Sequence, residues 1–203
     1  MSEQLVFELP AKAALGREAF LVAPSNAHAV KRLEDVARWP GNMMILVGPP
    51  GSGKSHLAHI WLAENPDGVV VEDVDQIAGD RAAETDLFHR FNDWRAAETL
   101  VLMTAQLPPV HTDWGLPDLA SRLQSLDLAQ IEEPDDQLLA VMLVKLFSDR
   151  QLAVKPELVT YLVARMPRSA SAARDIVARL DKRALQTGRA PSRALAAQVL
   201  DML

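Results

Sequence analysis

The sequence predicts an α/β domain with a parallel sheet and helices on both faces, followed by a small all-helical domain. Short continuous apolar segments such as Met43–Val47 are typical of strands buried on both faces. Segments with helical apolar spacing alternate with these strands, which favours parallel strands joined by helices. After the acidic segment Glu132–Asp136 only helical patterns remain. We therefore expect an arm over residues 1–22, a first domain over 23–132 and a second over 133–203.

Apolar spacing and turn residues define the elements of the first domain. A helix over 27–38, capped by Ser25 or Asn26, would place Val30, Leu33 and Ala37 on one face. Pro40-Gly41 ends this helix. We further expect buried strands over 43–47 and 69–71, two more strands over 100–104 and 126–131, and helices over 55–64, 84–97 and 116–123.

Capping residues and prolines define the helices of the second domain. Asp135 or Asp136 begins a helix that ends near Asp149, and Pro156 stands at the start of the next. Ser169 or Ser171 begins a third. The expected ranges are 136–149, 156–164, 169–185 and 192–203.

Composition excludes several classes of function. The 203 residues include 21 Lys and Arg against 27 Asp and Glu, a net charge of −6, which argues against non-specific nucleic-acid binding as the main role. There is no cysteine, which excludes disulfides, thiolate nucleophiles and cysteine-ligated zinc. The start of the chain lacks a basic segment followed by an apolar one, and no apolar run is long enough to span a membrane. We expect a soluble cytoplasmic protein that does not bind membranes.

The segment GPPGSGKS, which follows the first strand and begins a helix, fits the phosphate-binding pattern G-x-x-x-x-G-K-[ST]. Glycines let backbone N–H groups turn toward phosphate oxygens, and the helix adds its positive N-terminal end. A chance match would occur in roughly one chain of this length in a hundred. The expected nucleotide-binding residues of the loop are Gly48, Pro49, Pro50, Gly51, Ser52, Gly53, Lys54 and Ser55.

Two adjacent acids at the end of the second strand are candidates for the metal site. One of Glu72 and Asp73 would hold Mg²⁺ or its water, and the other would orient the attacking water. The Ser55 hydroxyl would be a further Mg²⁺ ligand. The alternative is a pair of acids that only faces solvent. Aspartate is usual at the first position, so Glu72 leaves this protein's own hydrolysis of ATP open.

Three more polar residues have both functional and structural interpretations. Thr104, at the end of the third strand, either reaches the γ-phosphate or its hydroxyl is satisfied by local backbone. Arg122, in a short helix, either points toward a neighbour's nucleotide or is a solvated surface arginine. Arg168, before a helix of the second domain, either contacts phosphate or is a surface charge.

Together these motifs resemble the AAA+ ATPases, and more narrowly the family of the replication initiator DnaA and its shorter relative Hda. The resemblance extends over about residues 20–200. It is carried by FLVAPSN at 20–26, SHLAH at 55–59, LFHRFN at 87–92, VLMTA at 101–105 and LPDLASRL at 116–123.

The resemblance implies roles for particular residues. Arg122 matches the arginine finger, which stabilises the transition state of phosphoryl transfer on another subunit's ATP. Thr104 matches the first sensor and Arg168 the second. Segments that match the nucleotide site add Val22, Asn26 and His56 to the residues that would bind ADP or ATP.

Two departures from the family bear on function. Only seventeen residues separate Lys54 from Glu72, where relatives have an extra strand and helix, so an edge element of the sheet is expected to be missing. The chain also ends after the helical domain, whereas the initiator continues into a DNA-binding domain. We therefore expect no direct sequence-specific DNA binding.

The N-terminal segment QLVFEL resembles the motif by which partners dock on the DNA polymerase sliding clamp (the β subunit of DNA polymerase III). Gln4 would bond to clamp backbone, and Leu5, Phe7 and Leu9 would fill an apolar pocket. The alternative is an arm that packs on its own domain or adds a strand.

The resemblance as a whole implies a regulator that restrains replication initiation. It would hold ADP or ATP with Mg²⁺, dock on the clamp and promote hydrolysis of DnaA-bound ATP through Arg122. An ATP-driven loader of a helicase or clamp, and an adaptor with purely structural nucleotide, remain alternatives. The sequence also leaves open whether the protein is a monomer or a nucleotide-dependent homodimer.

Overall fold

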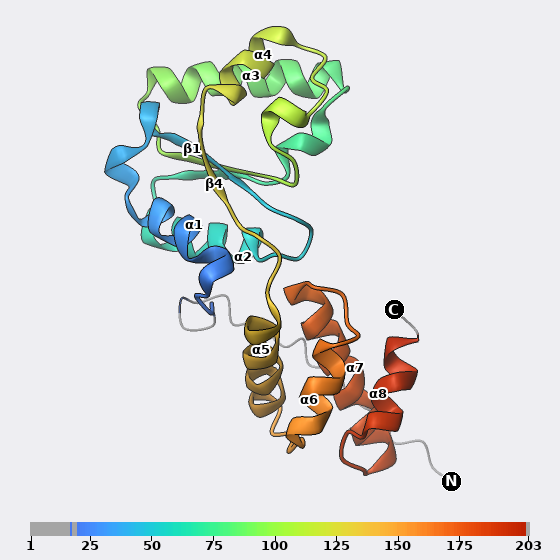
Figure 1. Ribbon diagram of the computed structural model, residues 1–203. Coiled ribbons are helices and arrows are strands. Elements are labelled where there is room, and N and C mark those ends of the chain that lie inside the picture. Colours follow the sequence, from blue (N-terminus) through green and yellow to red (C-terminus); the bar gives the residue numbers. More distant parts are fainter. Residues whose placement is uncertain (1–16, 18–19, 202–203) are drawn as a thin grey trace. The chain divides into compact units, whose positions relative to one another are not determined.

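A computed structural model of the protein describes residue 17 and residues 20–201 (Figure 1). These residues divide into two compact units, of which the first ends at Glu133 and the second begins at Pro134. Each unit has a hydrophobic core of its own.

Within the described residues, the first unit contains a parallel sheet of four strands in the order β2-β3-β1-β4. This sheet confirms the predicted α/β class. In the register, Met43 pairs with Val101 and Val47 with Ala105, so the carboxyl ends of β1 and β3 lie side by side. The strands are β1 (Met43–Val47), β2 (Val69–Val71), β3 (Val101–Ala105) and β4 (Asp127–Gln130).

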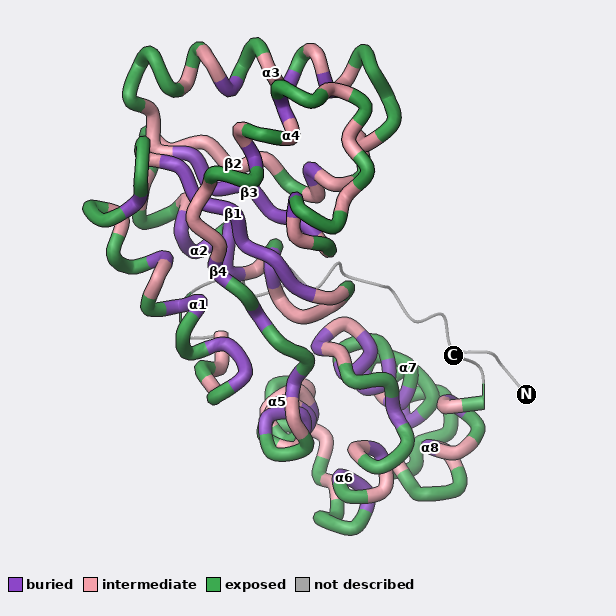
Figure 2. The backbone as a smooth tube through the Cα atoms, turned by 45° about the horizontal axis from the view of Figure 1, so that its top comes forward, coloured by how far each residue is buried: buried purple, intermediate pink, exposed green. Residues whose placement is uncertain are grey.

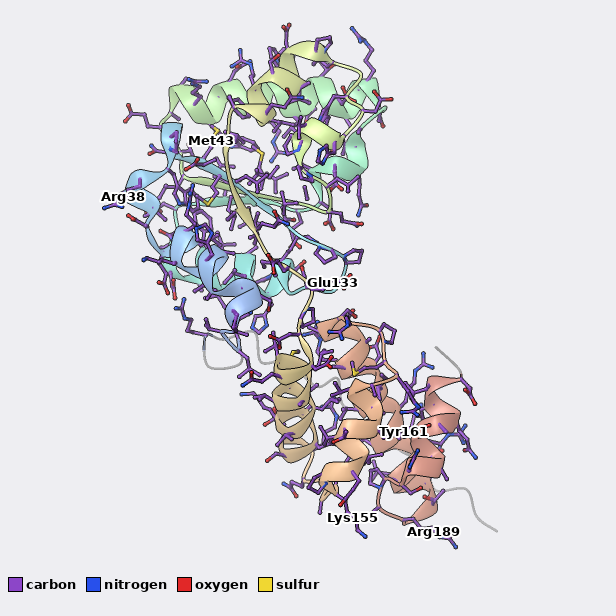
Figure 3. The ribbon with its side chains drawn as sticks, viewed as in Figure 1. Arg38, Met43, Glu133, Lys155, Tyr161 and Arg189 are labelled. Carbon is purple, nitrogen blue, oxygen red and sulfur yellow. The ribbon has the colours of Figure 1, made fainter. Side chains whose placement is uncertain are left out.

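Helices cover both faces of this sheet (Figure 1). Since side chains alternate along a strand, Met44 and Leu46 of β1 pack in the layer of α1 and α2, whereas Met43 and Ile45 pack in the layer of α3 and α4. β1 and β3 are buried throughout, as Figure 2 shows, and Figure 3 labels Met43 at the start of β1. The helices are α1 (Pro24–Glu34), α2 (Lys54–Glu64), α3 (Arg81–Ala96) and α4 (Pro117–Gln124).

The start of the unit differs from the sequence prediction. α1 begins at Pro24, because the Asn26 side chain accepts the backbone N–H of Ala23, the residue before the helix, at 2.9 Å. The predicted caps, Ser25 and Asn26, therefore lie in the first turn. α1 ends at Glu34, and the predicted core residue Ala37 is exposed in a short 3₁₀ turn.

Trp39 fills the core position that Ala37 was expected to take. Its ring is buried and stacks on Trp61 of α2 with centroids 5.3 Å apart, and its indole N–H donates to the carbonyl of Arg32. The α-helical spacing of apolar residues ends one turn before its predicted end, because a 3₁₀ turn has fewer residues per turn than an α-helix.

The burial of β2 also differs from the sequence prediction. Its three valines are only half-buried, because β2 pairs with β3 on one side and lies at the edge of the described strands. The short 3₁₀ turns Pro40–Asn42, Val74–Ile77 and Pro109–His111 were also not predicted.

The second unit is helical in the part that the structure describes, as predicted. Apolar side chains from all of its helices form one core. Tyr161 of α6, labelled in Figure 3, lies between the guanidinium groups of Arg165 and Arg193. The last helix ends at Leu200 and not at Leu203. The helices are α5 (Asp136–Asp149), α6 (Pro156–Val163), α7 (Ala170–Thr187) and α8 (Arg193–Leu200).

Asp135 and Ser169 are the capping residues that begin α5 and α7: their side chains accept the backbone N–H groups of Leu138 and Ala172. Of the helices that the structure describes, none is long and apolar enough to cross a bilayer.

Candidate functional site

The loop from Gly48 to Ser55 joins the carboxyl end of β1 to α2. Gly51 and Gly53 have φ values of 70° and 103°, in the left-handed region that favours glycine, and Gly53 is the N-terminal capping residue of α2. The loop is closed by a hydrogen bond from the N–H of Ser52 to the carbonyl of Pro49. This backbone suits a loop that offers N–H groups to phosphate oxygens at a helix N-terminus.

Gly48 has no room for a side chain. A Cβ atom at this position would lie 2.7 Å from the carbonyl oxygen of Ile131 and 3.0 Å from Ser52 Oγ. The N–H of Gly48 donates to the carbonyl of Ala105 at 3.2 Å. The first glycine of the loop is therefore required by close packing against the segment after β4.

Lys54 is buried beneath the loop, with only 7% of its surface exposed. Its ammonium donates to the carbonyls of Gly48 at 2.7 Å and Pro49 at 3.1 Å. Burial lowers the pKa of Lys54 below its ordinary value of 10.5, and the negative charges of Asp73, Asp75 and Glu72 partly oppose this effect. A buried ammonium that donates to two carbonyls of a glycine-rich loop is suited to pair with phosphate.

The acids after β2 have different environments. Glu72 is exposed, whereas Asp73 is half-buried and has a φ of 51°, which is uncommon for a residue other than glycine. Backbone strain of this kind is concentrated at functional sites.

Asp75 was missed by the sequence interpretation. Its Oδ2 atom accepts the N–H groups of Gln106 and Leu107 at 3.0 and 3.4 Å, so it connects the turn after β2 to the loop after β3. Its Oδ1 atom is buried and has no hydrogen-bond partner among the described residues. The available signal was a third acid, two residues after Asp73.

Thr104 is fully buried, and its hydroxyl accepts the backbone N–H of Asp73 at 2.9 Å. This is the local arrangement that the sequence left open beside contact with phosphate. The bond brings the ends of β2 and β3 together next to the loop.

The other residues predicted to bind the nucleotide, Val22, Asn26 and His56, belong to segments that meet near Phe20. The Phe20 ring meets the His56 ring edge-on at 5.4 Å, and it would contact a Cβ atom at Gly53. The Asn26 amide donates to the carbonyl of Leu21 at 2.9 Å and so holds the segment beside α1. Val22 is 56% exposed there and is available to a ligand.

The proposed Mg²⁺ ligands, Ser55 and Glu72, are both exposed and so accessible to a cation and its water. Among the described residues no group of three or more His, Asp or Glu side chains is arranged to hold a metal ion. Mg²⁺ is usually bound by one or two protein oxygens together with substrate phosphates and water, and Ser55 and Glu72 offer oxygens of this kind.

Arg122 lies away from these residues, on α4. Its guanidinium carbon is 4.8 Å from the ring centroid of Phe88 and 5.8 Å from that of Phe91, both on α3. α3 and α4 cover the face of the sheet opposite to α1 and α2. The structure therefore does not bring Arg122 together with Lys54.

Arg168 belongs to the second unit, where it pairs with Asp136 at 2.7 Å. Both side chains are at least half exposed, so this pair stabilises the unit little. The clamp-like residues Gln4, Leu5, Phe7 and Leu9 lie outside the described residues.

Sequence comparison finds replication initiators. The DnaA protein of Thermomicrobium roseum is 27% identical over 195 residues, covering 73% of this chain and 41% of that protein. The DnaA of Sphingopyxis alaskensis is 25% identical over 166 residues, covering 61% of this chain and 37% of the relative. The chain thus spans about two fifths of the length of these relatives. No protein-family model matches the chain.

Comparison with solved structures also finds DnaA among its matches. Domain III of DnaA from Thermotoga maritima superposes with a TM-score of 0.83 at 20% identity, covering 95% of this chain and 98% of that domain. The RuvB branch-migration motor of Thermotoga maritima superposes at 0.67 with 14% identity, covering 87% and 69%. The chain is thus similar in sequence to the replication initiator DnaA and shares the fold of domain III of that protein.

Proposed function

We propose that the protein is a regulator of replication initiation that binds adenine nucleotide and promotes hydrolysis of ATP held by DnaA. The position of Arg122 carries the proposal. α4 leads back from the carboxyl ends of the strands to the start of β4, and Arg122 lies in its second half. The phosphate loop follows the carboxyl end of β1, and its helix α2 covers the other face. This separation of Arg122 from the protein's own phosphate loop supports an action on another molecule's nucleotide.

Adenine nucleotide is the proposed ligand of the loop from Gly48 to Ser55. The left-handed glycines, the buried Lys54 and the exposed Val22 beside Phe20 support it. A related fold, DnaA of Aquifex aeolicus with a TM-score of 0.70, is described as bound to AMPPCP. Lys54 would pair with the β- and γ-phosphates, and Ser55 and Glu72 would hold Mg²⁺, which supplies positive charge to the phosphate oxygens.

The test is hydrolysis of DnaA-bound ATP in the presence of clamp loaded on DNA, comparing the wild type with Arg122→Ala. We expect the wild type to stimulate hydrolysis and Arg122→Ala to lose the stimulation, since an arginine finger contributes about 10³–10⁵ in rate. Arg90→Ala is the matched control: Arg90 also stacks on an aromatic ring, that of Trp94, but on the outer part of α3. Absence of stimulation by nucleotide-loaded wild type would reject the proposal and favour a loader or an adaptor.

Docking on the sliding clamp is a separate proposal, carried by the segment QLVFEL at 4–9. We expect Gln4→Ala combined with Leu5→Ala to abolish binding to the clamp, measured by surface plasmon resonance, with Lys12→Ala as the control. Clamp binding that survives the double substitution would contradict this assignment while leaving the role of Arg122 intact.

A further inference from the structure

Glu84 is a carboxylate with no exposed surface, and the nucleotide site does not use it. It accepts three backbone N–H groups, from Gly79 at 2.7 Å, Gly115 at 2.9 Å and Leu116 at 2.6 Å. Leu116 is the N-terminal capping residue of α4. Glu84 of α3 therefore fixes the place where α4 begins.

Two further contacts of α4 come from the same face of α3. Phe88 and Phe91 follow Glu84 by four and seven residues, which places all three side chains along one side of the helix. Phe88 lies 4.8 Å from the Arg122 guanidinium, and Phe91 lies 5.8 Å from it. One face of α3 thus holds α4 at its start through Glu84 and near its end through two aromatic rings.

We infer that Glu84 is a positioning residue for Arg122, acting with Phe88 to orient the guanidinium before a partner's nucleotide arrives. The inference rests on the proposed function of Arg122. A long flexible side chain loses conformational entropy when it is fixed in one rotamer. If the guanidinium is already oriented in the free protein, this entropy is lost before the transition state is reached. A charged acceptor is needed because three N–H donors converge on the two carboxylate oxygens of one side chain.

The first experiment tests the geometry and needs no partner protein. In NMR spectra of the full chain, the side-chain protons of Arg122 are expected to show ring-current shifts from Phe88 and Phe91. We expect Glu84→Gln to reduce these shifts, because an amide offers one acceptor and turns an NH₂ group toward backbone donors. Asp86→Asn, an exposed acid of the same helix, is the matched control and should leave them unchanged. Unchanged shifts in folded Glu84→Gln would overturn the inference.

The second experiment tests the consequence for activity. We expect Glu84→Gln to lower the maximal stimulation of DnaA-bound ATP hydrolysis by about 10- to 100-fold, the cost of a small misplacement, without changing the concentration that gives half-maximal effect. In an Arg122→Ala background the same substitution should cause no further loss. A further loss there would show that Glu84 acts by another route and would reject the inference.

A third variant tests the inference if Glu84→Gln does not fold. Phe88→Leu keeps an apolar side chain and leaves the bonds of Glu84 intact, so it should fold and still lower the stimulation. If wild type itself fails to stimulate, the proposed function is wrong, but the NMR comparison still decides whether Glu84 orients Arg122. If the shifts respond to Glu84→Gln while stimulation by that variant equals that of wild type, the positioning role of Glu84 is rejected and the proposed function of Arg122 is not.

Discussion

The backbone N–H of Asp73, a residue in the left-handed conformation, donates to the hydroxyl of Thr104 over 2.9 Å. The two residues are 31 positions apart in the chain and lie at the ends of neighbouring strands. This bond therefore links the acidic end of β2 to the end of β3.

Thr104→Val should lower the free energy of unfolding by about 1–3 kcal/mol, because it leaves the half-buried N–H of Asp73 without its acceptor. Thr104→Ser keeps the hydroxyl and should cost less. Urea denaturation of the two variants measures the difference. A Thr104→Val variant as stable as the wild type would show that the hydrogen bond does not stabilise this position.

Lys54→Ala should abolish stabilisation of the protein by ADP with Mg²⁺. Binding at one hundred times the dissociation constant raises the free energy of unfolding by about 2.7 kcal/mol, and this gain requires the ammonium to pair with phosphate. Thermal denaturation with and without nucleotide measures it. Lys31→Ala, an exposed lysine of α1, is the control and should retain the full shift. A shift that persists in Lys54→Ala would place the nucleotide elsewhere.

Glu84 should make the free energy of unfolding decrease as the pH falls. Burial by itself raises the pKa of Glu84, but the N–H groups of Gly115, Gly79 and Leu116 and the charge of Arg81 outweigh burial, so the pKa lies below its ordinary value of 4.5. The unfolded chain then binds a proton more readily than the folded one, so the contribution is complete above pH 4.5 and is lost as pH falls through the lower, folded value.

This dependence is measured by comparing wild type with Glu84→Gln. The wild type should be more stable by about 1–3 kcal/mol at neutral pH, since the substitution disturbs a buried acceptor. The difference should shrink as pH falls below 4.5. A difference that is constant with pH would contradict the ionised state of Glu84.

If Arg168 has the proposed second sensor role, Asp136→Asn should tighten nucleotide binding. Arg168 pairs with Asp136 in the second unit, and a carboxylate competes with phosphate for the same guanidinium. Because the pair is exposed, the substitution should change the free energy of unfolding by less than about 1 kcal/mol. Titration of a fluorescent ADP analogue measures affinity. Combining the change with Arg168→Ala should remove the gain, and a gain that remains would exclude Arg168 from the proposed second sensor role.

The sequence was sufficient for the fold class because β1 and β3 are apolar throughout and the phosphate loop lies between a strand and a helix. It misplaced Ala37, since helical periodicity does not reveal where an α-helix gives way to a 3₁₀ turn. It also treated β2 as buried, because an apolar run does not reveal which strand lies at an edge.

The site was predictable where chemistry follows from adjacent residues, as in the loop from Gly48 to Ser55. It was not predictable where contacts join distant segments. Glu84 meets Gly115 and Leu116 more than thirty residues later. An acid on the same face of α3 as Leu87 and Phe91 was the available signal, since a charge on an apolar face is costly unless it is paired.

The stacked pair of Trp39 and Trp61 belongs to a larger distribution of chromophores. The four tryptophans of the chain, at positions 39, 61, 94 and 114, all lie in the first unit, and the single tyrosine, Tyr161, lies in the second. Tryptophan emission therefore reports on unfolding of the first unit alone, whereas circular dichroism includes the helices of both units. Denaturation curves from the two signals coincide only if the units unfold as one cooperative body, so the protein carries its own spectroscopic test of how tightly its two halves are coupled.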